Sequence, residues 1–80
     1  MGYLPQVSGA RLLKALEKMG YSIVSQKGIH IKAAFECKKG KHTIIIPNHK
    51  TISKGTLNDI INKVSLWADK SKEEIIDMLK

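Results

Sequence analysis

The sequence predicts a small α+β domain in which helices cover one face of a three-stranded antiparallel sheet. The expected order is α-β-β-β-α, with a further short helix at the C-terminus. Apolar residues recur at helical spacing near both ends of the chain, and three β-rich segments separated by short glycine-containing turns lie between them. Connections this short join antiparallel neighbours. Since the chain has only 80 residues, we expect one domain over residues 1–80.

The first helix is expected over residues 8–19. Ser8 can cap its N-terminus, apolar side chains follow at helical spacing, and Gly20 can end it. The first strand is expected over residues 21–26. A tight turn at Lys27 and Gly28 follows, because glycine adopts a positive φ at little cost.

The second strand is expected from Ile29, where apolar and polar residues begin to alternate. Odd positions from Ile29 to Cys37 share one face, so Ile29 is expected to point into the core. Even positions share the other face, which places His30 beside Lys32 on the open side. The hairpin connection is expected at residues 38–41, and the third strand at residues 42–46, ending at Pro47.

The second helix is expected to be capped by Ser53 or Thr56, and apolar residues then recur at helical intervals as far as Trp67. Ser71 and Glu74 have the spacing of a capping box, which predicts the start of the last helix.

Positive charge is concentrated in one part of the chain. The net charge is +7, and residues 1–55 carry ten Lys and Arg against two Glu, whereas residues 56–80 carry four against five acidic residues. This asymmetry indicates a polyanionic partner. The alternative interpretation is that the lysines only keep the protein surface soluble.

Composition also limits the compartment and the chemistry. Cys37 is the single cysteine, so an internal disulfide and a multi-cysteine zinc site are excluded. The first residues lack a signal-peptide pattern, and no window approaches about 18 apolar residues. We therefore expect a cytoplasmic protein that does not enter a membrane and has no cofactor.

His30 has three possible roles: a surface or structural residue, a metal ligand, or a general base. His42 and His49 lie at spacings that match no zinc pattern, so we expect no metal site. Cys37 is expected to be a core residue. Imidazole exchanges a proton near neutral pH, and neighbouring lysines could hold a phosphate chain, which suits attack by an RNA 2′-hydroxyl on its own phosphodiester.

The sequence resembles the HicA toxins of toxin-antitoxin modules over about residues 3–64. The resemblance is carried by LPQVSGARLLKALEKMGYSIVSQKGIHIK and by GKHTIIIPNHKTISKGTLNDII. It implies a fold like the double-stranded-RNA-binding domain and an mRNA interferase that a HicB-type antitoxin neutralises by covering its active face. The family's catalytic histidine corresponds to His30. Family members usually have Gly-Ser-His where this chain has Gly28, Ile29 and His30, and the segment 65–70 is longer than the usual link to the last helix.

The leading hypothesis is a metal-independent endoribonuclease in which His30 accepts the 2′-hydroxyl proton. Lys32, with Lys27 or Lys41 nearby, would stabilise the phosphorane, and water, Lys32 or His42 would be the acid. The expected RNA-binding residues are Lys27, Gly28, Lys32, Lys38, Lys39 and Lys41. The main alternative is a non-catalytic RNA-binding module, and a third is an adaptor that binds an acidic protein through Ile45 and the lysines.

Overall fold

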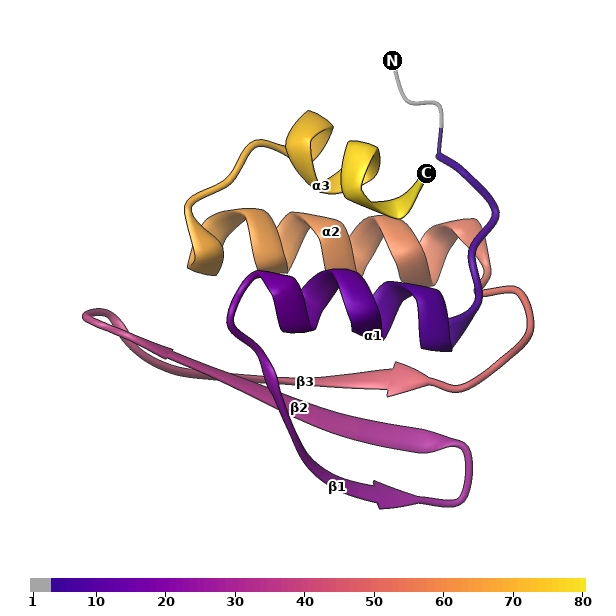
Figure 1. Cartoon of the computed structure of the whole chain (residues 1–80), viewed down its shortest axis with the longest axis horizontal. Coiled ribbons are helices and arrows are strands. Elements are labelled where there is room, and N and C mark those ends of the chain that lie inside the picture. Colours follow the sequence, from indigo (N-terminus) through magenta and orange to yellow (C-terminus); the bar gives the residue numbers. More distant parts are fainter. Residues whose placement is uncertain (1–3) are drawn as a thin grey trace.

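The computed structural model describes residues 4–80 and confirms the predicted fold. Its elements are α1 (Gly9–Lys18), β1 (Ser22–Lys27), β2 (His30–Cys37), β3 (Gly40–Pro47), α2 (Lys54–Ala68) and α3 (Lys72–Leu79). All three helices lie on one side of the sheet, and the other side is uncovered (Figure 1). Within residues 4–80, no helix combines the length and the apolar character that a membrane crossing requires.

The sheet is antiparallel with the order β1-β2-β3, so β2 is the central strand. The helices α1 and α2 lie between the sheet and α3 (Figure 1). Apolar side chains of the helices, of the helix-facing side of β2 and β3, and of the adjoining segments form one core. Its buried residues are Val7, Leu12, Ala15, Leu16, Met19, Tyr21, Ile31, Ala33, Ile44, Ile46, Ile52, Leu57, Ile60, Ile61, Val64, Ile75 and Leu79.

Each hairpin closes through a two-residue turn. Gly28 and Ile29 join β1 to β2, where Lys27 pairs with His30, and Gly28 has a φ of 60°. The prediction that Ile29 points into the core is wrong, because its side chain is 48% exposed. Ile29 belongs to the turn, so the alternation of the strand begins only at His30.

The third strand is longer than predicted. It begins at Gly40, directly after the turn residues Lys38 and Lys39, because Cys37 already pairs with Gly40. Ile44 and Ile46 face the core as expected, and Ile45 is 52% exposed on the other face. The ladder therefore extends to the tip of the hairpin.

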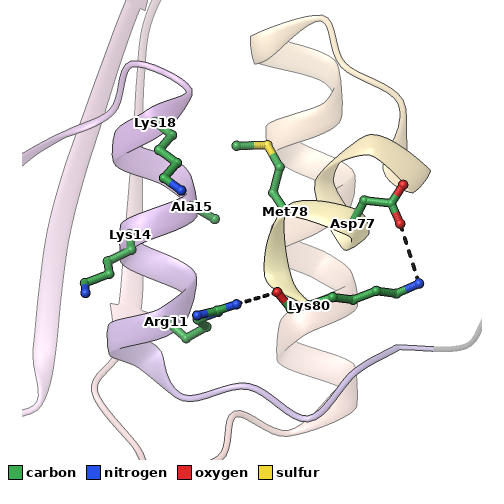
Figure 2. A pocket seen from close by; sticks show the side chains of 7 residues that line it. All are labelled: Arg11, Lys14, Ala15, Lys18, Asp77, Met78 and Lys80. Atoms are coloured by element: carbon green, nitrogen blue, oxygen red, sulfur yellow. Dashed lines mark hydrogen bonds and ion pairs between the residues drawn. The ribbon is translucent and has the colours of Figure 1, made fainter.

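Helix α1 is fixed at its start and bound to the end of α3. Ser8 caps it by accepting a hydrogen bond from the backbone N–H of Arg11 at 3.1 Å. The Arg11 guanidinium donates to the carbonyl oxygen of Leu79 at 3.4 Å. It also donates to the carbonyl oxygen of Lys80 (Figure 2). These contacts hold Arg11 in a basic pocket between α1 and α3, on the helical side of the molecule.

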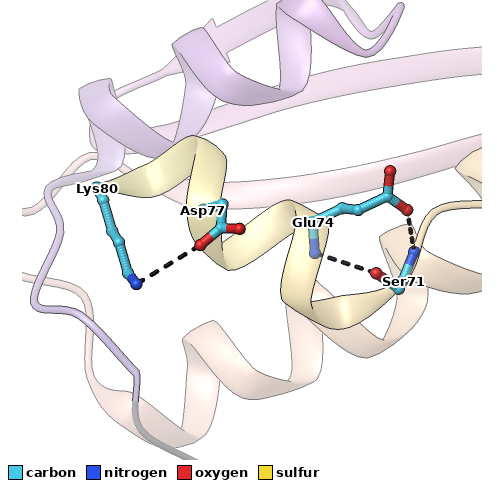
Figure 3. Close-up of polar contacts among 4 residues, drawn as sticks. All are labelled: Ser71, Glu74, Asp77 and Lys80. Carbon is cyan, nitrogen blue, oxygen red and sulfur yellow. Dashed lines mark hydrogen bonds and ion pairs between the residues drawn. The ribbon is translucent and has the colours of Figure 1, made fainter.

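The last two helices follow the predicted caps. Ser53 caps α2. Ser71 and Glu74 form the capping box of α3: the Glu74 N–H donates to the Ser71 hydroxyl at 3.1 Å, and the Ser71 N–H donates to the Glu74 carboxylate at 3.0 Å (Figure 3). These bonds lower the pKa of the Glu74 carboxyl. Helix α2 runs on to Ala68, so most of the segment 65–70 is helix and not an extended link.

Candidate active site

Strand pairing brings three predicted site residues together on the open face of the sheet. Residues directly opposite each other in an antiparallel ladder project to the same face. Lys27 lies opposite His30, and Lys32 is two residues further along β2 on the same face. All three side chains are exposed. Since the alternating partner Ile31 is buried under the helices, His30 projects away from them.

The strand register places the Cα atoms of Lys27 and Lys32 next to that of His30. Side chains two positions apart on a strand are separated by about 6.6 Å, and directly opposed Cα atoms by about 4.5 to 5.5 Å. Lys27 and Lys32 therefore flank His30 on two sides at one end of the sheet. This group of three, the His30 cluster, can bind a phosphate and leave the ring open to solvent.

The other predicted lysines lie at the opposite end of the sheet. Lys38 and Lys39 form the turn after β2, and Lys41 pairs with Glu36. Glu36 lies six residue steps along the strand from His30, a distance of about 20 Å. The expectation that Lys41 lies near His30 is therefore wrong, because the antiparallel return of β3 carries Lys41 away from it. Lys39 is also engaged, with its Nζ donating to the carbonyl of Leu66 at 2.7 Å.

His42 lies on the covered face and cannot reach the His30 cluster. It is only 9% exposed, its Nδ1 is 2.7 Å from the Tyr21 hydroxyl, and its ring stacks on Trp67 with centroids 5.1 Å apart. It pairs with Phe35, five residues along β2 from His30. The expectation that His42 could serve as the acid is wrong. Burial, and less strongly the charge of Lys63, lowers its pKa.

Cys37 is half-buried, on the same face of the sheet as His42. Cys37 was expected to be a core residue, and it faces the helix side of the sheet but is only partly buried there. Burial, followed by the nearby Cys37 thiolate charge, raises the pKa of Tyr21 to about 12. Within residues 4–80, no group of three His, Cys, Asp or Glu side chains could hold a metal ion.

His49 was weighed as a zinc ligand from the sequence and lies in the stretch that resembles the family, but it was given no catalytic role. It follows β3 in a loop that two backbone hydrogen bonds fix: Asn48 N–H donates to the carbonyl of Ile29 at 2.6 Å, and Gly9 N–H to that of His49 at 2.9 Å. Because Pro47 lies opposite His30, this loop starts at the end of the sheet that carries the His30 cluster. The sequence feature that could have placed His49 near His30 is its position two residues after Pro47, the residue that ends the third strand.

Two hollows of about 310 Å³ lie away from this cluster. One is the basic pocket, lined by Arg11, Lys14, Lys18 and Lys80 with Asp77 (Figure 2). The other lies beside the open face and is lined by Gly20, Ser22, Ala34, Glu36 and Lys41. His30 lines neither of these two hollows, and its side chain is exposed on the open face of the sheet.

The α-β-β-β-α order, with one basic face of the sheet left open, defines a small protein of the double-stranded-RNA-binding-domain-like class. Comparison with known families is more specific. A family model described as the HicA toxin of bacterial toxin-antitoxin matches residues 9–66, and the chain belongs to this family. It is therefore the toxin of a toxin-antitoxin system. No curated protein and no solved structure matched the sequence.

Proposed function

We propose that this toxin is a cytoplasmic endoribonuclease, a metal-independent mRNA interferase formed by a single domain over residues 1–80. In this proposal His30 removes the proton from an RNA 2′-hydroxyl, and cleavage gives a 2′,3′-cyclic phosphate and a 5′-hydroxyl end. One observation carries the proposal: the exposed side chain of His30 adjoins those of Lys27 and Lys32 on the uncovered face of the sheet. A positioned general base contributes about 10² to 10⁴ in rate.

The lysines of the cluster have a separate role. Negative charge accumulates on the non-bridging phosphate oxygens as the 2′-oxygen attacks, and cations fixed nearby stabilise that charge more than they stabilise the substrate. Lys27 comes from β1 and Lys32 from β2, so they approach the phosphate from different sides of His30. Gly28, which has no side chain, leaves the backbone of the adjacent turn accessible to RNA.

The lysines at the far end of the sheet would bind RNA at a distance from the cleaved bond. Lys41 lies on the open face and Lys38 is exposed at the turn, whereas Lys39 would have to release the carbonyl of Leu66 to reach RNA. A single strand lying along β2 would meet the His30 cluster at one end and these lysines at the other. We propose that they contribute to affinity and not to the chemical step.

An antitoxin of the HicB type is the proposed protein partner. The open face combines the exposed Ile45, which lies opposite Lys32, with the surrounding lysines. A partner that places an apolar side chain over Ile45 and acidic groups over the lysines would also cover His30. Inhibition would then follow from steric exclusion of RNA.

The decisive experiment is an analysis of the RNA ends that the purified chain produces. A defined single-stranded RNA is incubated with the protein in the presence of a chelator, and the products are examined by mass spectrometry. New 2′,3′-cyclic phosphate ends are expected. Tight binding with intact RNA would contradict the proposal and favour a non-catalytic RNA-binding module. A separate pull-down that recovers one acidic protein, from a chain that does not bind RNA, would favour an adaptor.

A further inference from the structure

We propose that His49 is the general acid of this reaction, the group that protonates the 5′-oxygen as it leaves. This inference rests on the proposed function and adds a second catalytic residue to the same site. It is carried by the way the backbone fixes the loop after β3 against the end of the sheet that holds His30.

Backbone geometry limits the distance between the two histidines. Pro47 is paired with His30 in the β2–β3 ladder, and His49 follows two residues later. A paired Cα separation of about 5.5 Å and two residue steps of about 3.8 Å place the two Cα atoms within about 13 Å. Two imidazoles that turn toward each other across this separation can contact one phosphodiester.

The loop is held at both of its flanks. On one side Asn48 donates to the carbonyl of Ile29, the residue before His30, at 2.6 Å. On the other side the carbonyl of His49 accepts from Gly9 at the start of α1, at 2.9 Å. The chain approaches so closely that a Cβ on Gly9 would lie 2.8 Å from the Cα of Asn48. The backbone of His49 is therefore fixed, and its side chain remains exposed.

The alternative acids are less suitable. His42 is buried on the opposite face and bonded to Tyr21. Lys32 lies on the correct face, but an ammonium group is a much weaker acid than an imidazolium and is better suited to stabilising charge. His49 is the remaining histidine, and it lies at the same end of the sheet as the proposed base.

Two imidazoles account for both proton transfers in this step. His30 takes the proton from the 2′-hydroxyl as the 2′-oxygen forms its bond to phosphorus. The bond between phosphorus and the 5′-oxygen breaks, and that oxygen takes a proton from the His49 imidazolium. The products are the 2′,3′-cyclic phosphate and the 5′-hydroxyl, and exchange with water returns both rings to their starting states.

A substrate with sulfur in place of the leaving 5′-oxygen tests this assignment, because a thiolate leaves without needing a proton. On ordinary RNA, His49→Ala is expected to slow cleavage by about 10² to 10⁴. On the 5′-thio RNA, the same variant should cleave at nearly the wild-type rate, whereas His30→Ala should remain slow on both. Lys50→Gln, in the same loop, is the matched control and should retain the wild-type ratio of the two rates.

The possible results separate the two proposals. If wild type leaves ordinary RNA intact, the proposed function fails and the assignment of His49 fails with it. If wild type cleaves, His30→Ala is inactive and His49→Ala is as active as wild type, only the role of His49 is overturned. A slow His49→Ala that the thio substrate does not restore would also overturn it, because the residue would then act on binding or loop structure.

Discussion

The hydroxyl oxygen of Tyr21 and the Nδ1 of His42 lie 2.7 Å apart in the interior of the protein. His42 also stacks on Trp67, with an angle of 2° between the rings, and Tyr21 stacks on Phe35 with centroids 5.0 Å apart. The hydrogen bond satisfies a polar ring buried between the sheet and α2. These contacts identify His42 as a structural residue.

Tyr21→Phe is expected to lower the free energy of unfolding by about 1 to 3 kcal/mol, because it leaves the buried His42 nitrogen without its partner. The stacking on Phe35 should survive, since the ring is kept. Urea unfolding measures the change. Ser25→Ala, at an exposed position of β1, is the control and should stay within about 0.5 kcal/mol of wild type. An unchanged free energy of unfolding in Tyr21→Phe would show that the hydrogen bond does not contribute to stability.

The lowered pKa of His42 predicts a loss of stability in acid. Below about pH 6.5, the ordinary value for histidine, the unfolded chain binds a proton on this ring that the folded protein does not bind. The contribution to the free energy of unfolding is therefore complete above that pH and is lost as the pH falls towards the lower folded pKa.

Urea unfolding at several pH values between about 5 and 8 measures this dependence. The double variant Tyr21→Phe, His42→Phe removes both polar groups and keeps two aromatic rings, so it should lose the part of the pH dependence that His42 causes. Parallel profiles for wild type and the double variant would contradict the assignment.

Gly9→Ala should be destabilising although alanine favours helices. A Cβ at this position would lie 2.8 Å from the Cα of Asn48 and closer still to the carbonyl oxygen of Pro47, so the loop must move or the helix must shift. We expect a loss of about 1 to 3 kcal/mol in urea unfolding. Gly55→Ala in α2, where no atom lies within 4 Å of the added Cβ, should instead be neutral or stabilising by up to about 1 kcal/mol. Equal effects of the two changes would refute the close contact.

Salt dependence tests the role of the lysines on the open face. If about four of them neutralise phosphates of single-stranded RNA, the slope of log K against log salt should be near −3. Binding is measured with His30→Ala so that the RNA stays intact. Lys27→Gln and Lys32→Gln should each make the slope shallower by about 0.7, and Lys72→Gln on α3 should leave it unchanged. Identical slopes for all three variants would exclude this surface as the RNA site.

Local sequence signals were sufficient for most of the fold. The alternation in β2 correctly placed His30 and Lys32 on one face and Ile31 on the other, because neighbouring strand residues must point in opposite directions. The caps at Ser8 and Ser71 were likewise predictable, since each depends on residues three positions apart.

Relationships between segments were not predictable from those signals. Alternation indicates the face of a residue but not where a turn ends, so Ile29 was assigned to the core although it lies in the turn. It also does not show which end of the sheet a residue occupies, which is why Lys41 was expected near His30. The stacking of Trp67 on His42 depends on how α2 packs against β3, and neither segment alone specifies it.

The most direct test of the central claim is the rate at which His30→Ala cleaves a defined RNA, compared with wild type and supported by equal melting temperatures. The account predicts that the variant folds normally, binds RNA, and cleaves at least about 10²-fold more slowly. A folded His30→Ala variant that cleaves as fast as wild type would contradict the assignment of this histidine as the base.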